Sequence, residues 1–252
     1  MPLINRKISV IMPAHNEGAR IYGNLIKTHK VLKRTFVSHE IILVNDGSHD
    51  NTAAEARRAS AVADTIKVVN YASNAGKGNA LKTGFSHASG KLVAFLDADL
   101  DIHPRQIQTL FHIMDKTHAD VVIGSKYHSA SKVNTPKRRK LISLIYKIIL
   151  FVLFRLPLRD TQAGLKLFKT EVLEKVFPKI VCKQFAFDVE LLANAHRIGY
   201  KISECPIVLK FRREMRWGNV KFETLYYTGM DTLAIFYRMY ILRYYDSTSQ
   251  RI

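Results

Sequence analysis

Three aspartates at alternate positions are the sharpest chemical feature of this sequence. Asp97, Asp99 and Asp101 follow the apolar run KLVAFL directly. Alternate residues of an extended segment face the same way, so we expect the three carboxylates to converge. Converging carboxylates repel one another unless a cation neutralises them, and Mg²⁺ or Mn²⁺ completed by substrate phosphates suits such oxygen ligands. The spacing therefore predicts a divalent-metal site, the alternative being acidic residues at a strand end or helix cap.

Four other apolar runs are each followed by polar or glycine-containing residues. These segments are 13–17 (PAHNE), 45–48 (NDGS), 74–78 (NAGKG) and 124–126 (GSK). Asp46 suits a carboxylate that accepts hydrogen bonds from a nucleobase, or a tight turn before a helix. Segment 74–78 offers backbone N–H groups at a helix start plus Lys77, which suits contact with a diphosphate or base. No G-x-x-x-x-G-K-S/T motif is present and no G-x-G-x-x-G follows the first run, which disfavours a P-loop and a dinucleotide fold.

The elements that position these residues alternate regularly. Apolar, largely β-branched runs predict strands at 8–12, 40–44, 65–69, 92–96 and 120–123, and helical spacing lies between them at about 17–34, 51–60, 78–88 and 104–116. The alternation predicts an α/β fold: an open, doubly wound, mostly parallel sheet with helices on both faces. In such sheets ligands bind beyond the carboxyl ends of the strands, so the segments listed above meet at one edge and predict an active site there.

Composition and charge narrow the function classes. The 252 residues are 47% hydrophobic, which fits a large α/β domain with a buried core and argues against disorder. The net charge is +18, and residues 126–170 hold 11 basic residues against the single acid Asp160. Such a block indicates a polyanionic partner, namely nucleic acid, anionic lipid or a phosphorylated substrate, or else a solvated basic face. Cys182 and Cys205 lack C-x-x-C spacing, which excludes a thiolate zinc cluster and a disulfide scaffold.

Two later segments are candidates for membrane contact. In 136–155, the cluster KRRK precedes LISLIYKIILFVLF, where Lys140, Ser143 and Lys147 form a narrow polar stripe on an otherwise apolar helix. This run is too short to span a bilayer but suits a helix lying in the membrane interface; a core helix or a dimer contact is the alternative. The aromatic stretch after Phe222 suits either a membrane-associating tail or a helix packed on the sheet. The first apolar run is too short for a signal peptide, so we expect a peripheral protein on the cytoplasmic face of the membrane.

These motifs together resemble those of a known family. PAHNE, NDGS, NAGKGNAL, DADLD and GSK look like the GT-A family 2 glycosyltransferases. RDTQAGLKLF (159–168) and FAFDVELL (185–192) are similar to the polyprenyl-phosphate sugar synthases, above all the dolichyl-phosphate β-glucosyltransferases, with the dolichol-phosphate mannose synthases next. The resemblance implies a GT-A catalytic domain over 1–215, with 136–155 as an interface-helix insertion, and a helical, membrane-associating tail over 216–252.

The resemblance also implies an activity: inverting transfer of a hexose from a nucleotide sugar, UDP-glucose or otherwise GDP-mannose, to dolichyl or polyprenyl phosphate, with Mg²⁺ or Mn²⁺. It implies the following site residues. The nucleotide contacts are Pro13, Ala14, Asn16, Glu17, Asp46, Lys77, Asp97 and Ala98. The metal ligands are Asp97 and Asp99, with Asp101 where mannose synthases usually carry glutamine. The acceptor phosphate falls to Lys126 and Arg139, and the reacting groups to Asp99, Asp160 and Lys126. Gln162, Asp188 and Arg212 are candidates for the donor sugar.

The chain departs from this family in two places. Where members often show a Ser-Lys pair before the last helices, residues 217–221 read WGNVK, so Arg212 or Arg213 would supply the donor contacts there. Nothing beyond Phe222 resembles the transmembrane pair that some members carry. An acceptor phosphate monoester is mostly a dianion at pH 7, so no strong general base is required, and Asp160 and Asp188 would position the acceptor or the sugar hydroxyls.

Two other function classes compete with this one. The charge would suit a nucleic-acid-binding protein, but no helix-turn-helix, RNP-like or zinc-finger pattern is present, so we expect no nucleic-acid partner. A family 2 enzyme acting on a glycan would usually show Q-x-x-R-W, which is absent. The sequence leaves open uridine against guanosine, glucose against mannose, the lipid length, the preferred metal and whether copies of the chain assemble.

Overall fold

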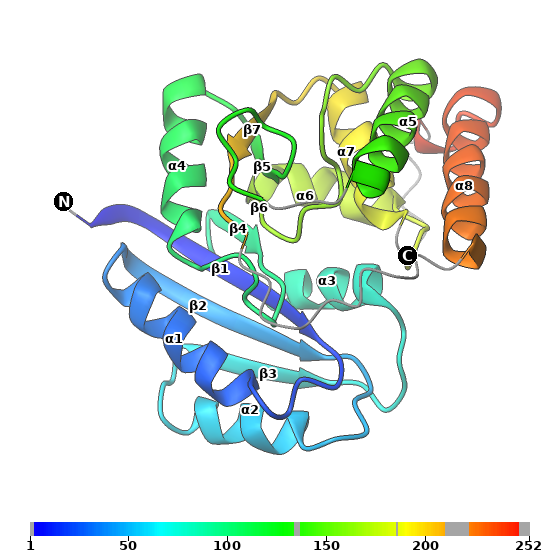
Figure 1. Ribbon diagram of the computed structural model, residues 1–252. Coiled ribbons are helices and arrows are strands. Elements are labelled where there is room, and N and C mark those ends of the chain that lie inside the picture. Colours follow the sequence, from blue (N-terminus) through cyan, green and yellow to red (C-terminus); the bar gives the residue numbers. More distant parts are fainter. Residues whose placement is uncertain (1–2, 134–136, 185, 210–221, 247–252) are drawn as a thin grey trace.

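A single mixed sheet forms the centre of the molecule. The structure, a computed structural model, describes residues 3–133, 137–184, 186–209 and 222–246. Within them the strands are β1 (Ile4–Ala14), β2 (Phe36–Asn45), β3 (Ile66–Asn70), β4 (Leu92–Phe95), β5 (Val121–Ser125), β6 (Lys166–Lys169) and β7 (Ile202–Pro206). Their order across the sheet is β3-β2-β1-β4-β6-β5-β7 (Figure 1). The five strands expected from the apolar runs are confirmed, and their pairings β3-β2-β1-β4 are parallel as predicted.

Helices cover both faces of this sheet. One face carries α1 (Ile21–Lys33), α2 (Thr52–Ser60) and α4 (Gln106–Thr117), whose buried residues join one core cluster. The other carries α3 (Lys77–Ser86), α6 (Thr170–Val176) and α7 (Phe187–Arg197), with α5 (Lys137–Phe154) and α8 (Phe222–Phe236) outside them. Three short turns complete the described chain: η1 (Phe177–Lys179), the π-helical η2 (Tyr237–Ile241) and η3 (Tyr244–Asp246). The doubly wound, mostly parallel α/β fold is confirmed.

Strand β6, like β7, was not predicted from the sequence pattern. It runs antiparallel to both β4 and β5, with Lys166 opposite Phe95 and Ile123. Because its direction is reversed, β6 begins where β4 and β5 end. The segment that precedes it, residues 159–165, therefore enters at the carboxyl edge where the site was expected.

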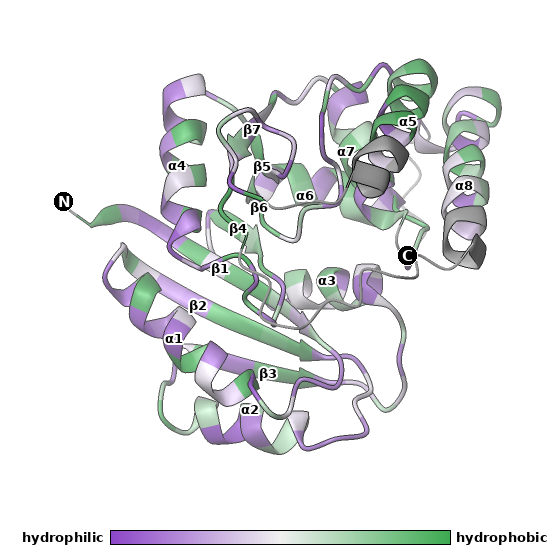
Figure 2. Cartoon of the chain, in the orientation of Figure 1, coloured by the Kyte–Doolittle hydropathy of each residue, from purple (hydrophilic) through white to green (hydrophobic). Residues whose placement is uncertain are grey.

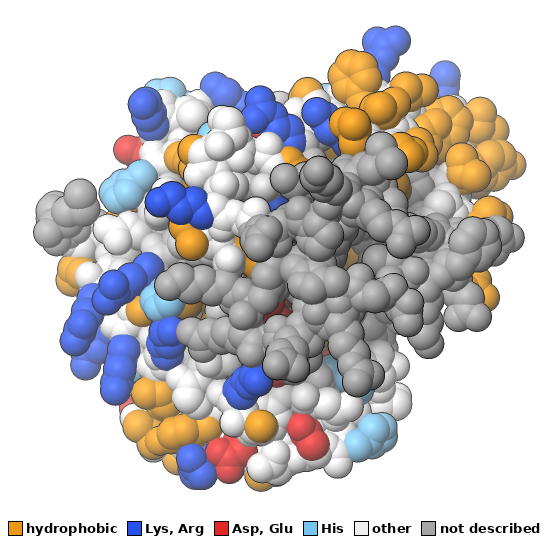
Figure 3. Space-filling view, in the orientation of Figure 1, with side chains coloured by type: hydrophobic (Ala, Val, Ile, Leu, Met, Phe, Trp, Pro, Cys, Tyr) orange, Lys and Arg blue, Asp and Glu red, His pale blue; other side chains and the backbone are white. Residues whose placement is uncertain are grey.

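Helix α5 packs against the protein along one side and exposes apolar residues on the other. Leu150 and Phe154 are buried, whereas Ile148 is 54% and Val152 71% exposed. The part of α5 that is coloured in Figure 2 is largely hydrophobic, and in Figure 3 hydrophobic side chains gather over α5 and α8. Helix α5 is therefore not a fully buried core helix. Among the described residues, no helix has both the length and the hydropathy needed to cross a bilayer.

Candidate active site

The loop at 74–78 is organised by a buried aspartate. Asp46, at the end of β2 and only 4% exposed, accepts hydrogen bonds from the backbone N–H groups of Ala75 at 2.7 Å and Gly76 at 3.0 Å. Gly76 has a φ of +92°, a conformation that favours glycine. Asp46 thus shapes the loop that begins α3, and its contact with a nucleotide stays a prediction.

The chain at the end of β1, residues 13–17, forms a rim beside that loop and is hydrogen-bonded to the chain that follows β2. Pro13 and Ala14 lie opposite Val44 and Asn45 in the sheet register. Beyond them, the Asn16 side-chain oxygen accepts a hydrogen bond from the His49 N–H at 2.9 Å, and the Glu17 N–H donates to the Thr52 hydroxyl at 2.8 Å. These bonds bring the predicted nucleotide residues of the two strands to one edge.

An aspartate–lysine pair stands at the centre of the site. Lys77 Nζ lies 2.6 Å from Asp97 Oδ1, and both side chains are about four-tenths exposed, at 39% and 42%. Burial by itself would raise the pKa of Asp97, but the charge and hydrogen bond of Lys77 hold it below its usual value. A Cβ on Gly164 would lie 1.8 Å from Asp97 Oδ2, so any side chain at that position would push the carboxylate aside. The neighbouring Ala98 presents its carbonyl away to Asn24, whose amide donates to it at 2.8 Å.

Asp99 has the opposite electrostatic surroundings. Burial raises its pKa, and the negative charges of Asp97, Asp101 and Glu17 raise it further. Its Oδ1 accepts a hydrogen bond from the Asp101 N–H at 3.1 Å. Among the described residues no three His, Cys, Asp or Glu side chains form a ready-made metal group. The donor set still fits a hard divalent cation, because such ions are commonly held by one or two carboxylates together with substrate phosphates.

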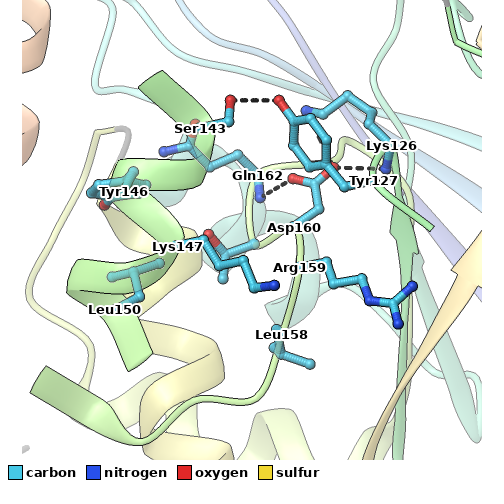
Figure 4. Close-up of a pocket in the computed structure, with 11 residues that line it drawn as sticks. Lys126, Tyr127, Ser143, Tyr146, Lys147, Leu150, Leu158, Arg159, Asp160 and Gln162 are labelled. Carbon is cyan, nitrogen blue, oxygen red and sulfur yellow. Dashed lines mark hydrogen bonds and ion pairs between the residues drawn. The ribbon is translucent and has the colours of Figure 1, made fainter. Parts of the chain in front are cut away.

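A cationic pocket lies next to this centre, between α5 and the segment before β6 (Figure 4). Its lining combines three cations, several hydroxyls and one acid: Lys126, Tyr127, Ser143, Tyr146, Lys147, Leu150, Leu158, Arg159, Asp160, Thr161 and Gln162. Asp160, 6% exposed, accepts hydrogen bonds from the Lys126 and Gln162 N–H groups at 2.9 and 3.0 Å, and its carboxylate lies 3.4 Å from Lys126 Nζ. The predicted residues Lys126, Asp160 and Gln162 therefore come together.

Sequence reasoning did not assign two of the pocket's cations, Lys147 and Arg159, to the site. Lys147 reaches from α5 toward the segment that carries Arg159 (Figure 4). The signal was present, since Ser143 and Lys147 stand four apart on the polar stripe of an apolar helix, and both line the pocket. Arg159 reaches the pocket because the antiparallel direction of β6 places the residues before it, 159–165, at this edge of the sheet.

A buried pair, Lys166 and Asp188, underlies the site. Lys166 Nζ lies 2.8 Å from Asp188 Oδ1 and donates to the Ala163 carbonyl at 2.6 Å. Lys166 is 1% and Asp188 7% exposed, so Asp188 is already neutralised by a lysine that the sequence did not single out. Arg139 lies on α5, where only its backbone is described, and Arg212 lies outside the described residues.

Comparison with solved structures identifies the fold. Glucosyl-3-phosphoglycerate synthase from Mycobacterium tuberculosis in complex with UDP superimposes with a TM-score of 0.69 at 20% identity, covering 97% of this chain and 82% of that one. Mannosyltransferase PcManGT from Pyrobaculum calidifontis, in complex with GDP-Man and Mn²⁺, gives 0.65 at 20% identity, covering 94% and 65%. At these identities the likeness establishes the fold, which is GT-A.

Sequence comparison then gives the family. Residues 9–177 match the family described as Glycosyl transferase family 2. A dolichyl-phosphate beta-glucosyltransferase of Trichomonas vaginalis is 31% identical over 240 residues, covering 90% of this chain and 70% of the relative. The enzyme of that name from Dictyostelium discoideum is 31% identical over 219 residues, covering 82% and 67%. The chain belongs to glycosyl transferase family 2, and it is a glycosyltransferase.

Proposed function

We propose that this enzyme transfers a hexose from a nucleotide sugar, with UDP-glucose as the favoured donor, to dolichyl or polyprenyl phosphate, with inversion at the anomeric carbon. The observation that carries the proposal is the pocket of Lys126, Lys147 and Arg159, which lies between the aspartate centre and the exposed apolar side of α5. Its volume of about 80 Å³ is far below the ~300 Å³ of pockets that enclose drug-sized ligands. That size suits a phosphate group whose lipid chain stays outside.

The donor half of the proposal is supported by the loop at 74–78 and the rim at 13–17. The Lys77 ammonium at the start of α3 suits the diphosphate of a nucleotide sugar, because a cation there forms charge-assisted hydrogen bonds with phosphate oxygens. The dolichyl-phosphate beta-glucosyltransferase relatives support glucose and a lipid phosphate. The alternatives are GDP-mannose as donor, or a glycan in place of the lipid acceptor.

A divalent cation fits the acidic side of this site. Asp99, with Asp97 and Asp101 beside it, would hold Mg²⁺ or Mn²⁺, which when bound supplies positive charge to the departing diphosphate. Solved structures of the same fold include complexes with Mn²⁺. Lys77 lies in position to add to that charge, since its ammonium already faces Asp97 at 2.6 Å.

The residues around the acceptor have binding and orienting roles. Lys126 and Lys147 would hold the phosphate by charge-assisted hydrogen bonds. Asp160 fixes Lys126 through its backbone N–H at 2.9 Å and faces its ammonium. Because the acceptor arrives as a dianion, these groups need only bring its oxygen to the anomeric carbon. Gln162, which is exposed at the same pocket, and Asp188 would orient the sugar.

The exposed apolar side of α5 supports a peripheral position on a membrane. Leu144, Ile145 and Phe151 are each more than half exposed on the same helix as Ile148 and Val152. Such a face beside basic residues suits burial in the headgroup region of an anionic bilayer, on the cytoplasmic side in this proposal. A lipid phosphate lying in that bilayer would meet the pocket without leaving the membrane.

Lysine substitutions in the pocket test the proposal. In Lys126→Gln and Lys147→Gln we expect the KM for polyprenyl phosphate to rise about tenfold or more each, because each loses a charged hydrogen bond, while the KM for the donor is unchanged. Lys30→Gln, at an exposed position on α1, is the matched control and should behave as wild type. Unchanged acceptor KM in both pocket variants would overturn the acceptor assignment.

A further inference from the structure

A buried carboxylate outside the site joins the C-terminal segment to the body of the protein. Glu190 on α7 is 0% exposed. Its Oε1 lies 3.2 Å from Arg238 Nη2 and accepts a hydrogen bond from the Tyr245 hydroxyl. Its Oε2 accepts hydrogen bonds from the Val181 and Cys182 N–H groups at 3.0 and 2.7 Å. The Glu190 side chain therefore connects η2 and η3 with segment 180–183.

Segment 180–183 in turn braces the loop at 74–78. The Lys183 carbonyl accepts a hydrogen bond from the Gly78 N–H at 2.9 Å, and the Ile180 carbonyl accepts one from Lys82 Nζ on α3 at 3.0 Å. The fit is close, because a Cβ on Gly76 would lie 2.6 Å from the Lys183 oxygen. The loop is thus held from one side by Asp46 and from the other by a segment that depends on Glu190.

The bonds to Glu190 are suited to fixing one geometry. A carboxylate buried at this depth is stable only when its oxygens are fully bonded, and a guanidinium, a phenol and two backbone N–H groups do this. Arg238 also donates from Nε to the Tyr245 oxygen at 3.0 Å, so the two C-terminal groups orient each other. Loss of either changes where the carboxylate holds residues 181 and 182.

We propose that Glu190 is a positioning residue through which Arg238 and Tyr245 of the C-terminal segment set the geometry of the donor-binding loop. The inference rests on the proposed function only in taking 74–78 as the donor loop. By this proposal the C-terminal segment contributes to donor binding. It also forms part of the outer surface, since Tyr237 and Ile241 of η2 are 52% and 62% exposed.

The experiment compares Arg238→Met and Tyr245→Phe with Arg197→Met in the full chain. Arg197 pairs with Asp246 in the same C-terminal segment but is not among the groups bonded to Glu190, so it is the matched control. Calorimetric titration with UDP and with GDP, without acceptor, gives nucleotide affinity, and amide hydrogen exchange of residues 74–78 reports the loop directly. We expect Arg238→Met to weaken nucleotide binding about tenfold and to speed exchange at Gly78, with Tyr245→Phe in between and Arg197→Met unchanged. Arg238→Lys, which keeps the charge, should restore part of the loss.

The outcomes separate this inference from the proposed function. Unchanged affinity and exchange in folded Arg238→Met would overturn the inference, and so would equal losses in Arg197→Met, since the segment would then act only by docking. If Arg238→Met does not fold, Tyr245→Phe and the double variant Glu190→Gln/Arg238→Met carry the same comparison. Wild-type protein that binds neither UDP nor GDP would contradict the donor site itself, while the exchange data would still decide whether Glu190 holds the loop.

Discussion

Acidic and cationic side chains are paired at the carboxyl edge of the sheet. Lys77 faces Asp97, Lys126 faces Asp160 and Lys166 faces Asp188, at 2.6, 3.4 and 2.8 Å. Asp99 differs, because burial and three neighbouring acids raise its pKa. Because Asp99, unlike these three aspartates, forms no ion pair with a lysine among the described residues, we propose it as a ligand of the divalent cation.

Replacing Asp99 by asparagine tests that assignment. The change keeps the shape and removes the charge, so we expect kcat to fall about 10²-fold or more while circular dichroism and unfolding stay near wild type. Asp115→Asn, at an exposed position on α4, is the control. A wild-type rate for the Asp99 variant in buffer with excess Mg²⁺ or Mn²⁺ would end the metal assignment.

Gly164 offers a steric test at the same scale. In Gly164→Ala the new Cβ would lie 1.8 Å from Asp97 Oδ2 and must displace that carboxylate from Lys77. A displacement of about an ångström in a catalytic group costs about 10²-fold in rate, so we expect a loss of that size in initial rates. Gly23→Ala, where a Cβ would meet nothing within 4 Å, should leave the rate unchanged. Equal rates for both variants would contradict the role given to this contact.

At the scale of elements, the Glu40 side chain bonds to groups on or next to several strands, away from the edge of the sheet that carries the site. The β2 carboxylate accepts hydrogen bonds from Ser9 on β1 at 2.6 Å, Lys67 on β3 at 2.7 Å and the Ser89 N–H before β4 at 2.7 Å. Burial would raise its pKa, but these donors lower it to about 2, against an ordinary value of 4.5. Because the pKa is lower in the folded state, Glu40 stabilises the fold fully above pH 4.5, and this stabilisation is lost as the pH falls toward 2.

Glu40→Gln should therefore lower the free energy of unfolding by about 1–3 kcal/mol at pH 7. The difference from wild type should shrink as the pH falls below 4.5. Urea denaturation at pH 7, 4.5 and 3.5 measures it. A difference that stays constant over this range would show that the charge of Glu40 is not what stabilises these strands.

The elements also show how far the sequence could be read. Strands β1 to β5 are predictable because each contains an apolar run followed by a polar turn, and helices α1 to α4 because each has helical spacing between two such runs. Strands β6 and β7 were missed. Two of the four residues of β6 are lysines, and Lys166 is buried because it pairs with Asp188, while β7 (ISECP) buries only one of its five residues and has no continuous apolar run. From the motifs, most candidate site residues could be placed at one edge of the sheet. The positions of Lys147, Arg159 and the Glu190 network depend instead on contacts between segments far apart in the chain.

At the scale of the whole molecule, charge and exposed apolar surface occur in the same region. The basic block at 126–170 contains α5, whose outward side chains are apolar. Anionic lipids would attract the basic residues, and the bilayer would bury the exposed apolar side chains of α5.

Vesicle binding tests this arrangement. Ile148→Asp/Val152→Asp should reduce sedimentation with phosphatidylserine-containing vesicles about tenfold or more, because two exposed apolar side chains no longer enter the bilayer. Val62→Asp, equally exposed at 64% after α2, should bind as wild type does. Binding that is unchanged in the α5 variant would place the membrane surface elsewhere.

The central claim is that the acceptor is a lipid phosphate. It is tested most directly by incubating purified protein with a polyprenyl phosphate, Mg²⁺ or Mn²⁺, and labelled UDP-glucose or GDP-mannose in parallel, followed by extraction into organic solvent. We predict organic-phase label from UDP-glucose alone, abolished by EDTA. Label from GDP-mannose instead would contradict the donor preference, and the absence of organic-phase label from either donor would contradict the lipid-phosphate acceptor.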